Sequence, residues 1–164
     1  MSYVVVFLAT RWGSQLGGLN EFNTGLALGM ADVLPRGSRC ICYVAKLSDN
    51  PTPPTGNVEV LICPDDTSIL VNDIKKVCDD PKLDSLHGLL IVGHDIKTGQ
   101  KAVECSEALR AQVRIGPVAS AVVSHMDYVQ YGHRKGHTLN ESFSRMKQQE
   151  TVIASADHAF AVGP

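Results

Sequence analysis

The fold is decided by Trp12-Gly13-Ser14-Gln15-Leu16-Gly17-Gly18-Leu19-Asn20, which lies between the apolar run Tyr3–Ala9 and a helical pattern over Glu21–Val33. A strand, a glycine-containing turn and a helix in this order can form an anion site. Glycines admit a close ligand, and the helix N-terminus presents unpaired N–H groups. The stretch is neither G-x-G-x-x-G nor G-x-x-x-x-G-K-[ST], so it is not a dinucleotide fingerprint or a Walker loop. Phosphate binding and an ordinary strand-to-helix turn both stay open.

Apolar runs of strand length alternate with helical patterns along the rest of the chain. The expected strands are Tyr3–Thr10, Arg39–Ala45, Glu59–Ile62, Gly88–Val92, Val118–Ser124 and His158–Val162. Most are continuous apolar runs, which is typical of parallel strands covered on both faces. The expected helices cover Glu21–Val33 with Asn20 as N-cap, about Ser68–Asp79, the segment from after Thr98 to about Gln112, and a segment after Asn140 with Phe143, Met146 and Ile153 on one face. This order predicts an α/β fold, a Rossmann-like three-layer α/β/α domain with a mainly parallel sheet of about six strands.

The composition indicates one compact domain. The chain has 164 residues, of which 44% are hydrophobic and 20% charged, so it can bury a sizeable core. Its formal net charge of -2 gives no reason to expect nucleic acid or an acidic membrane surface as a partner. No apolar run has the length of a membrane span, and the N-terminus lacks the basic region of a signal peptide.

The five cysteines do not form a pattern that binds metal or builds a disulfide framework. Their number is odd, and no C-x-x-C occurs. Cys40 and Cys42 stand two apart on one expected strand and should face the same side. We therefore expect a cytoplasmic protein with small, reduced core cysteines.

Polar residues follow three of the expected strands directly. The glycine stretch follows the first strand, Gly93-His94-Asp95 follows Gly88–Val92, and Ser124-His125 ends the strand Val118–Ser124. In open parallel sheets, ligands bind at the carboxyl ends of the strands near a switch in strand order. A lone histidine is more often structural than catalytic, but two histidines at one sheet edge form a candidate site. A structural role for His94 and His125 stays open.

Two further features allow two interpretations each. The segment His133-Arg134-Lys135-Gly136-His137 is expected to be a cationic loop, which either contacts a phosphate or carboxylate through Arg134 and Lys135 or is simply a solvated surface. Trp12 either stacks on a sugar or base or pins the glycine stretch to the sheet. No carboxylate or cysteine stands at a suggestive spacing from His133 and His137, so no metal site is expected.

The motifs above, taken in order, resemble the N-terminal half of a GT-B-type glycosyltransferase, in the retaining family that includes sucrose synthase, sucrose-phosphate synthase and glycogen synthase. The resemblance rests on Gly17-Gly18 with Asn20, on Gly93-His94-Asp95, on Ser124-His125 followed by the basic segment, and on the ending Ser155-Ala156-Asp157-His158-Ala159-Phe160-Ala161-Val162-Gly163-Pro164. That ending is similar to the family's strand that leads towards a second domain.

This resemblance implies roles for individual residues. The backbone of Gly17 and Gly18 would face the diphosphate of a nucleotide sugar, with Asn20, Arg134 and Lys135 in the same substrate-binding set. His125 would be the catalytic histidine near the transferred sugar and the acceptor, and His94 and Asp95 would line the acceptor side. A retaining transfer needs donors that stabilise a departing diphosphate, and no cofactor is implied.

The resemblance also implies a second domain, which in this fold carries most of the nucleotide site. The chain stops at Pro164, where that domain would begin. We therefore expect half of a glycosyltransferase, inactive alone, with a nucleotide sugar and a small-molecule or glycan acceptor as partners. The alternative is a recognition or effector module of a larger multidomain signalling protein, without transferase activity. A homo-oligomer stays open. A generic flavodoxin-like receiver is disfavoured, because Thr10-Arg11-Trp12 stands where a receiver needs acidic residues.

Overall fold

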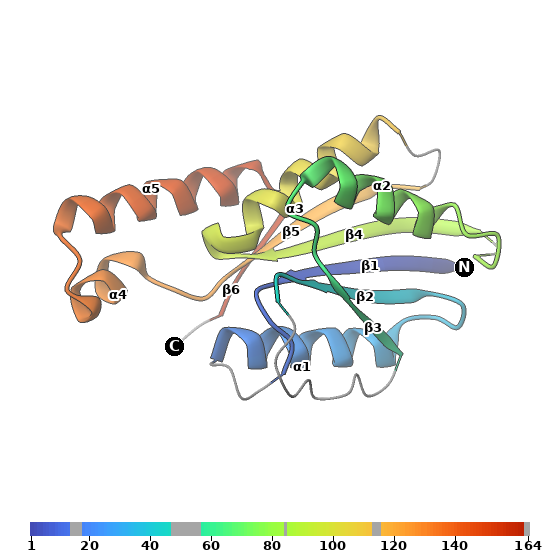
Figure 1. Cartoon of the computed structure of the whole chain (residues 1–164), viewed down its shortest axis with the longest axis horizontal. Coiled ribbons are helices and arrows are strands. Elements are labelled where there is room, and N and C mark those ends of the chain that lie inside the picture. Colours follow the sequence, from blue (N-terminus) through green and yellow to red (C-terminus); the bar gives the residue numbers. More distant parts are fainter. Residues whose placement is uncertain (14–17, 47–56, 84, 113–115, 163–164) are drawn as a thin grey trace.

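The computed structural model describes residues 1–13, 18–46, 57–83, 85–112 and 116–162 (Figure 1). In chain order the elements are β1 (Ser2–Ala9), α1 (Gly18–Val33), β2 (Arg39–Val44), β3 (Val58–Ile62), α2 (Thr67–Cys78), β4 (Leu86–His94), α3 (Asp95–Arg110), β5 (Val118–Ser124), α4 (Tyr128–Lys135), α5 (Leu139–Ser155) and β6 (His158–Ala161). The strands form one six-stranded sheet in the order β3-β2-β1-β4-β5-β6, and every pair is parallel. The predicted Rossmann-like α/β/α architecture is confirmed.

The order of the strands reverses at β1. Val4 pairs with Arg39 of β2 on one side and with Leu89 of β4 on the other. The chain therefore builds one half of the sheet outward from β1 to β3 and then returns to start the second half at β4. Ligands of open parallel sheets bind at such a switch point, outside the carboxyl ends of the strands.

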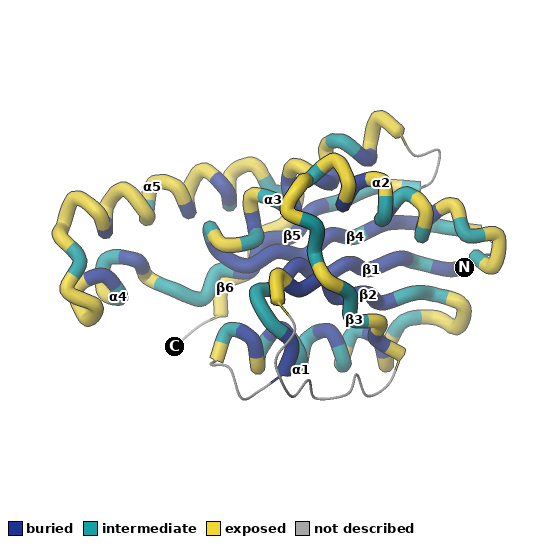
Figure 2. The backbone as a smooth tube through the Cα atoms, in the orientation of Figure 1, coloured by how far each residue is buried: buried dark blue, intermediate teal, exposed yellow. Residues whose placement is uncertain are grey.

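Both faces of β1 are buried, because its successive side chains enter different cores. Val4, Val6 and Leu8 pack with residues of α2 and α3, whereas Val5 and Phe7 pack with residues of α1. Accordingly α1 lies on one face of the sheet and α2, α3 and α5 lie on the other (Figure 1), and the strands between them form the buried centre (Figure 2). This double burial explains why the strand sequences are continuous apolar runs. Cys40 and Cys42 lie in the same core cluster, as predicted.

The start of α1 and the start of α3 differ from the predictions. Asn20 is not an N-cap, because α1 begins at Gly18 and includes it. The α3 helix begins at Asp95 rather than after Thr98, so the segment between the strand and Thr98 is already helical. The Thr98 hydroxyl accepts the His94 backbone N–H at 2.8 Å and donates to the Leu8 carbonyl at 2.8 Å, which ties the first turn of α3 to β1 and β4.

The segment predicted as a cationic loop is the end of helix α4. Its N-cap Asp127 accepts from the backbone N–H groups of Val129 and Gln130, and Gly136 ends the helix with φ 72°. These are standard helix-start and helix-stop residues. The face predicted for α5 is buried only in part: Met146 and Ile153 are half-buried, but Phe143 is 47% exposed, and the fully buried residues are Ser142, Gln149 and Val152. Among the described residues, none of the helices combines the length and apolar character needed to cross a membrane.

Candidate functional site

Two histidines meet at the carboxyl edge of the sheet. His94 is the last residue of β4 and His125 directly follows β5. His94 Nδ1 lies 2.9 Å from His125 Nε2. His94 is fully buried, whereas His125 is partly exposed and is flanked edge-on by the ring of Phe22, with ring centroids 4.6 Å apart. Of the two rings, therefore, only that of His125 can meet a ligand.

A buried asparagine fixes the protonation of both rings. His94 Nε2 lies 2.7 Å from Asn23 Oδ1, and Asn23 Nδ2 donates to Cys42 Sγ at 3.4 Å. An amide oxygen only accepts, so the proton of His94 is on Nε2 and its Nδ1 accepts. His125 must then donate through Nε2, which leaves a lone pair on its Nδ1. No described residue hydrogen-bonds to that atom.

Burial keeps both imidazoles neutral at physiological pH. Desolvation, with a smaller effect of His125, lowers the pKa of His94 to about 4. Desolvation also lowers the pKa of His125, against an opposing effect of the Asp95 carboxylate. Neutral rings are what the hydrogen-bond assignment requires, because a doubly protonated His94 has no acceptor for His125.

Asp95 connects the two strand ends. It is fully buried and has a positive φ of 46°, a conformation that a non-glycine residue rarely adopts. Its Oδ1 accepts from the backbone N–H of His125 at 2.9 Å and from Gln149 Nε2 at 2.9 Å. Such strained residues persist where the surrounding structure over-determines them, often at functional sites. Asp95 thus holds the His125 backbone in place and does not itself face solvent.

Two residues of this network, Asn23 and Gln149, are not among the site residues predicted from the sequence. Gln149 donates to Ser124 Oγ at 2.8 Å and to the Met126 carbonyl at 3.1 Å, and so holds the segment on both sides of His125. Both residues are polar side chains on helices, where an exposed position is the usual expectation. Only the helix orientation shows that they face inward.

The junction after β1 is organised by side chains rather than by glycine backbone alone. Asn20 Oδ1 accepts from Thr10 Oγ1 at 2.8 Å and from the Arg11 N–H at 3.1 Å. Gly13 has φ 107° and donates its N–H to Thr24 Oγ1 at 3.0 Å. Gly17 lies outside the described residues. Gly18 is the exposed first residue of α1 and is not among the glycines with positive φ.

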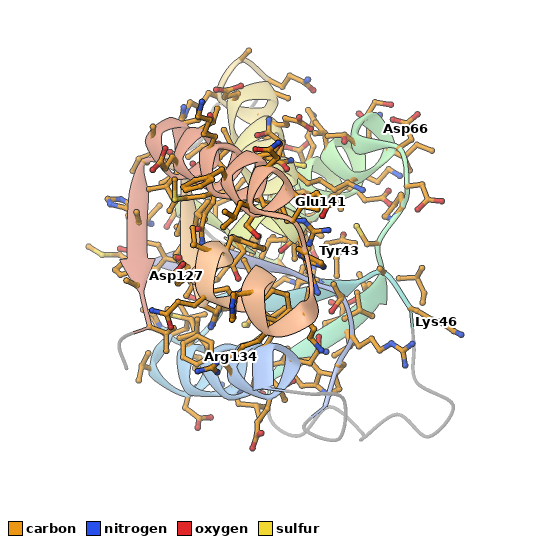
Figure 3. The ribbon with its side chains drawn as sticks, turned by 90° about the vertical axis from the view of Figure 1, so that its left-hand side faces the viewer. Tyr43, Lys46, Asp66, Asp127, Arg134 and Glu141 are labelled. Carbon is orange, nitrogen blue, oxygen red and sulfur yellow. The ribbon has the colours of Figure 1, made fainter. Side chains whose placement is uncertain are left out.

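Trp12, Arg134 and Lys135 take different positions. Trp12 is only 3% exposed and belongs to the core cluster on the α1 face, so it pins the junction to the sheet and is not available to stack on a ligand. Arg134 and Lys135 are exposed in the last turn of α4, and Figure 3 shows Arg134 on the side of the molecule that carries the strand ends. Lys135 Nζ lies 5.7 Å from the centroid of the Tyr131 ring. In the described part of the chain, no group of three or more His, Cys, Asp or Glu side chains is arranged to hold a metal ion.

One comparison with known proteins finds a relationship over nearly the whole chain. A family model described as Family 4 glycosyltransferase in conflict systems matches residues 6–164. No curated protein and no solved structure matches the chain. The match supports a GT-B-like glycosyltransferase domain without selecting the sucrose synthase or glycogen synthase type.

Proposed function

This chain belongs to the Family 4 glycosyltransferases in conflict systems, and we propose that it forms the acceptor-side half of an enzyme that transfers a sugar from a nucleotide sugar with retention. The observation that carries the proposal is the His125 ring. It is partly exposed at the carboxyl edge of the sheet and it is neutral, and the chain of hydrogen bonds through His94 to Asn23 leaves one lone pair without a partner among the described residues.

The proposed role of His125 follows from this geometry. Its Nδ1 accepts a hydrogen bond from a hydroxyl of the transferred sugar or of the acceptor. Because the partner ring His94 cannot rotate without losing Asn23, the acceptor atom is oriented before the substrate arrives. Preorganised polar groups of this kind act where charge develops during the departure of the diphosphate. No cofactor is required for this chemistry.

The diphosphate would lie near the N-terminus of α1, where Gly18 begins the helix. Arg134 and Lys135 would approach the substrate from α4. Most of the nucleotide would contact a second domain, so we expect the 164-residue chain to bind nucleotide sugars weakly, with dissociation constants of about 1 mM or higher. Calorimetry with common nucleotide sugars tests this, and a micromolar constant would show that the donor site is complete within this chain.

Replacement of His125 tests the proposed function directly. In the full-length protein, His125→Ala should lower the rate of sugar transfer by about 100-fold, in line with the loss of one preorganised group. The matched control is His87→Ala at the opposite end of β4, where the contacts of the ring with described residues are the Ser85 carbonyl and hydroxyl and the ring of Tyr3. Equal rates in the two variants would contradict a catalytic role for His125.

We propose, as the second candidate function, a recognition or effector module of a larger protein that has no transferase activity. The family description, glycosyltransferase in conflict systems, is compatible with both functions. On this alternative the full-length protein binds its ligand at the same site without turning it over. Ligand binding that His125→Ala abolishes, in a protein that releases no nucleoside diphosphate, would favour the module.

A further inference from the structure

A pocket lies between the start of α3 and the helices α4 and α5. The α4 and α5 helices pack against each other (Figure 3). Its polar lining comes from Lys97 on α3, Tyr128 and Tyr131 on α4, and Arg145 and Gln148 on α5. Met126, the residue after His125, also lines it. A molecule in this pocket would therefore contact the residue that follows His125.

Two cations from different helices line the pocket, and neither forms a direct ion pair with a described residue. They are Lys97 and Arg145, and both are exposed. Glu141 stands one turn before Arg145, but its carboxylate accepts from the Thr138 backbone N–H at 2.8 Å and from the Thr138 hydroxyl at 2.9 Å. These hydrogen bonds from Thr138, with a smaller effect of Arg145, lower the pKa of Glu141, so the charge of Arg145 is partly offset. The Arg145 guanidinium and the Lys97 ammonium keep their donors for a ligand.

The Tyr128 hydroxyl is a buried donor without a partner. Tyr128 is 2% exposed, and no described residue hydrogen-bonds to its hydroxyl with ordinary geometry, although the backbone N–H of Ile96 in the first turn of α3 faces it. Burial, with a smaller effect of the Asp95 carboxylate, raises the pKa of Tyr128 to about 12, so the phenol keeps its proton. A buried hydroxyl without a partner is unfavourable, and a ligand oxygen that accepts from it removes that cost.

Two carboxylates oppose an anion here, Glu141 through Arg145 and Asp95 through Tyr128, and neither lines the pocket. Asp95 Oδ1 is engaged by the His125 backbone and Gln149, while its Oδ2 is buried without a hydrogen-bond partner among the described residues. The pocket itself thus presents two cationic side chains, a phenol donor and the N-terminal turn of a 16-residue helix. This combination is suited to an oxyanion with several acceptor oxygens.

We propose that this pocket binds an anionic group of the acceptor, a phosphate ester or a carboxylate, held by Lys97, Arg145 and the Tyr128 hydroxyl. The assignment of that anion to an acceptor rests on the proposed glycosyltransferase function. The acceptor hydroxyl of such a molecule would extend past Met126 towards His125.

Binding of three sugars to the chain tests the proposal. Glucose 6-phosphate, glucuronate and glucose share a ring and differ in a phosphate ester, a carboxylate and no charge. Amide shifts in ¹H–¹⁵N spectra give affinity and location for each, and confirm that every variant is folded. The variants are Lys97→Ala and Arg145→Ala, with Lys147→Ala as the matched control, because Lys147 is exposed on α5 and does not line the pocket.

We expect at least one anionic sugar to shift amides around Met126 and Gln148 and to bind more tightly than glucose. Each pocket variant should weaken that binding by about tenfold, the effect of losing one charge-assisted contact, and Lys147→Ala should not. The sugar that binds identifies phosphate or carboxylate as the group recognised. Equal binding of glucose, no binding of either anion, or affinity unchanged in both pocket variants would overturn the proposal. Because no transfer is needed, an intact anion response in a protein without transferase activity would contradict only the proposed function.

Discussion

Two strand-to-helix junctions meet at the carboxyl edge of the sheet, and they are built in opposite ways. Between β1 and α1 the chain has an eight-residue connection, residues 10–17, with glycines at 13 and 17. Between β4 and α3 there is no connection at all, because His94 ends the strand and Asp95 begins the helix. At this second junction the chain changes direction from β4 into α3 through the positive φ of Asp95, and Gly93 packs against Thr98 and Gly99 of the helix.

The difference shows where side chains can be placed accurately. Where no loop separates strand and helix, the positions of the side chains are determined by those two elements. Rigid elements hold functional groups more accurately than loops do. Each junction is also held by one asparagine of α1, Asn20 at the first and Asn23 at the second. We therefore expect the β4–α3 junction to be more rigid than the β1–α1 junction.

Valine at each junction should produce the largest contrast. A Cβ at Gly93 would stand 2.5 Å from the Thr98 carbonyl oxygen and 2.7 Å from Gly99 Cα, both backbone atoms that cannot move independently. A Cβ at Gly18 would meet nothing within 4 Å. Gly93→Val should therefore lower the free energy of unfolding by about 3 kcal/mol, and Gly18→Val by less than about 1 kcal/mol. Denaturant unfolding of both variants measures these free energies. Similar decreases in the two variants would contradict a difference in rigidity between the junctions.

Acid should weaken the second junction specifically. Burial lowers the pKa of His94 from an ordinary 6.5 to about 4, so between pH 6.5 and 4 His94 is protonated in the unfolded chain and neutral in the folded chain. The free energy of unfolding is therefore highest above pH 6.5 and falls by about 3 kcal/mol in total as the pH drops to 4. Unfolding free energies at several pH values in this window should fall steeply for the wild-type chain and less for His94→Gln. Parallel curves would show that His94 is not the group responsible.

Removing the asparagine of each junction should have smaller and unequal effects. Asn23 is fully buried, and Asn23→Leu leaves the His94 Nε2–H without an acceptor, at a cost of about 2 kcal/mol. Asn20→Ala removes bonds to Thr10 and Arg11 at a partly buried site, at a cost of about 1 kcal/mol.

The two asparagine variants should also differ in a signal that stability does not determine. Asn23→Leu frees the His94 tautomer, so the imidazole ¹⁵N shifts of His125 should change from a single tautomer to a mixture, whereas Asn20→Ala should leave them unchanged. A single His125 tautomer in Asn23→Leu would refute the control of His125 through His94.

The strands were predictable because each is a local apolar run whose meaning does not depend on distant residues. Val118–Ser124 was predicted with its exact bounds, and the other strands were predicted within one or two residues at each end. The helix starts were less predictable. At α3, Asp95 adopts an uncommon φ that no sequence rule assigns to it, and the predicted start after Thr98 was four residues late. The α4 helix had its signals, Asp127 and Gly136, but it is only eight residues long.

The candidate site, too, was predictable from the sequence in part. Sequence alone placed His94, Asp95 and His125 at one edge of a parallel sheet, because the carboxyl ends of parallel strands share an edge. Sequence alone did not show that the two rings are bonded, that His94 and Asp95 are buried, or that Asn23 and Gln149 complete the network. These depend on the rotation of α1 and α5 about their axes and on the register of β4 with β5, where His94 lies beside Val123. A hydrogen bond requires placement within a few tenths of an ångström, and only the packing of whole elements against one another determines distances that small.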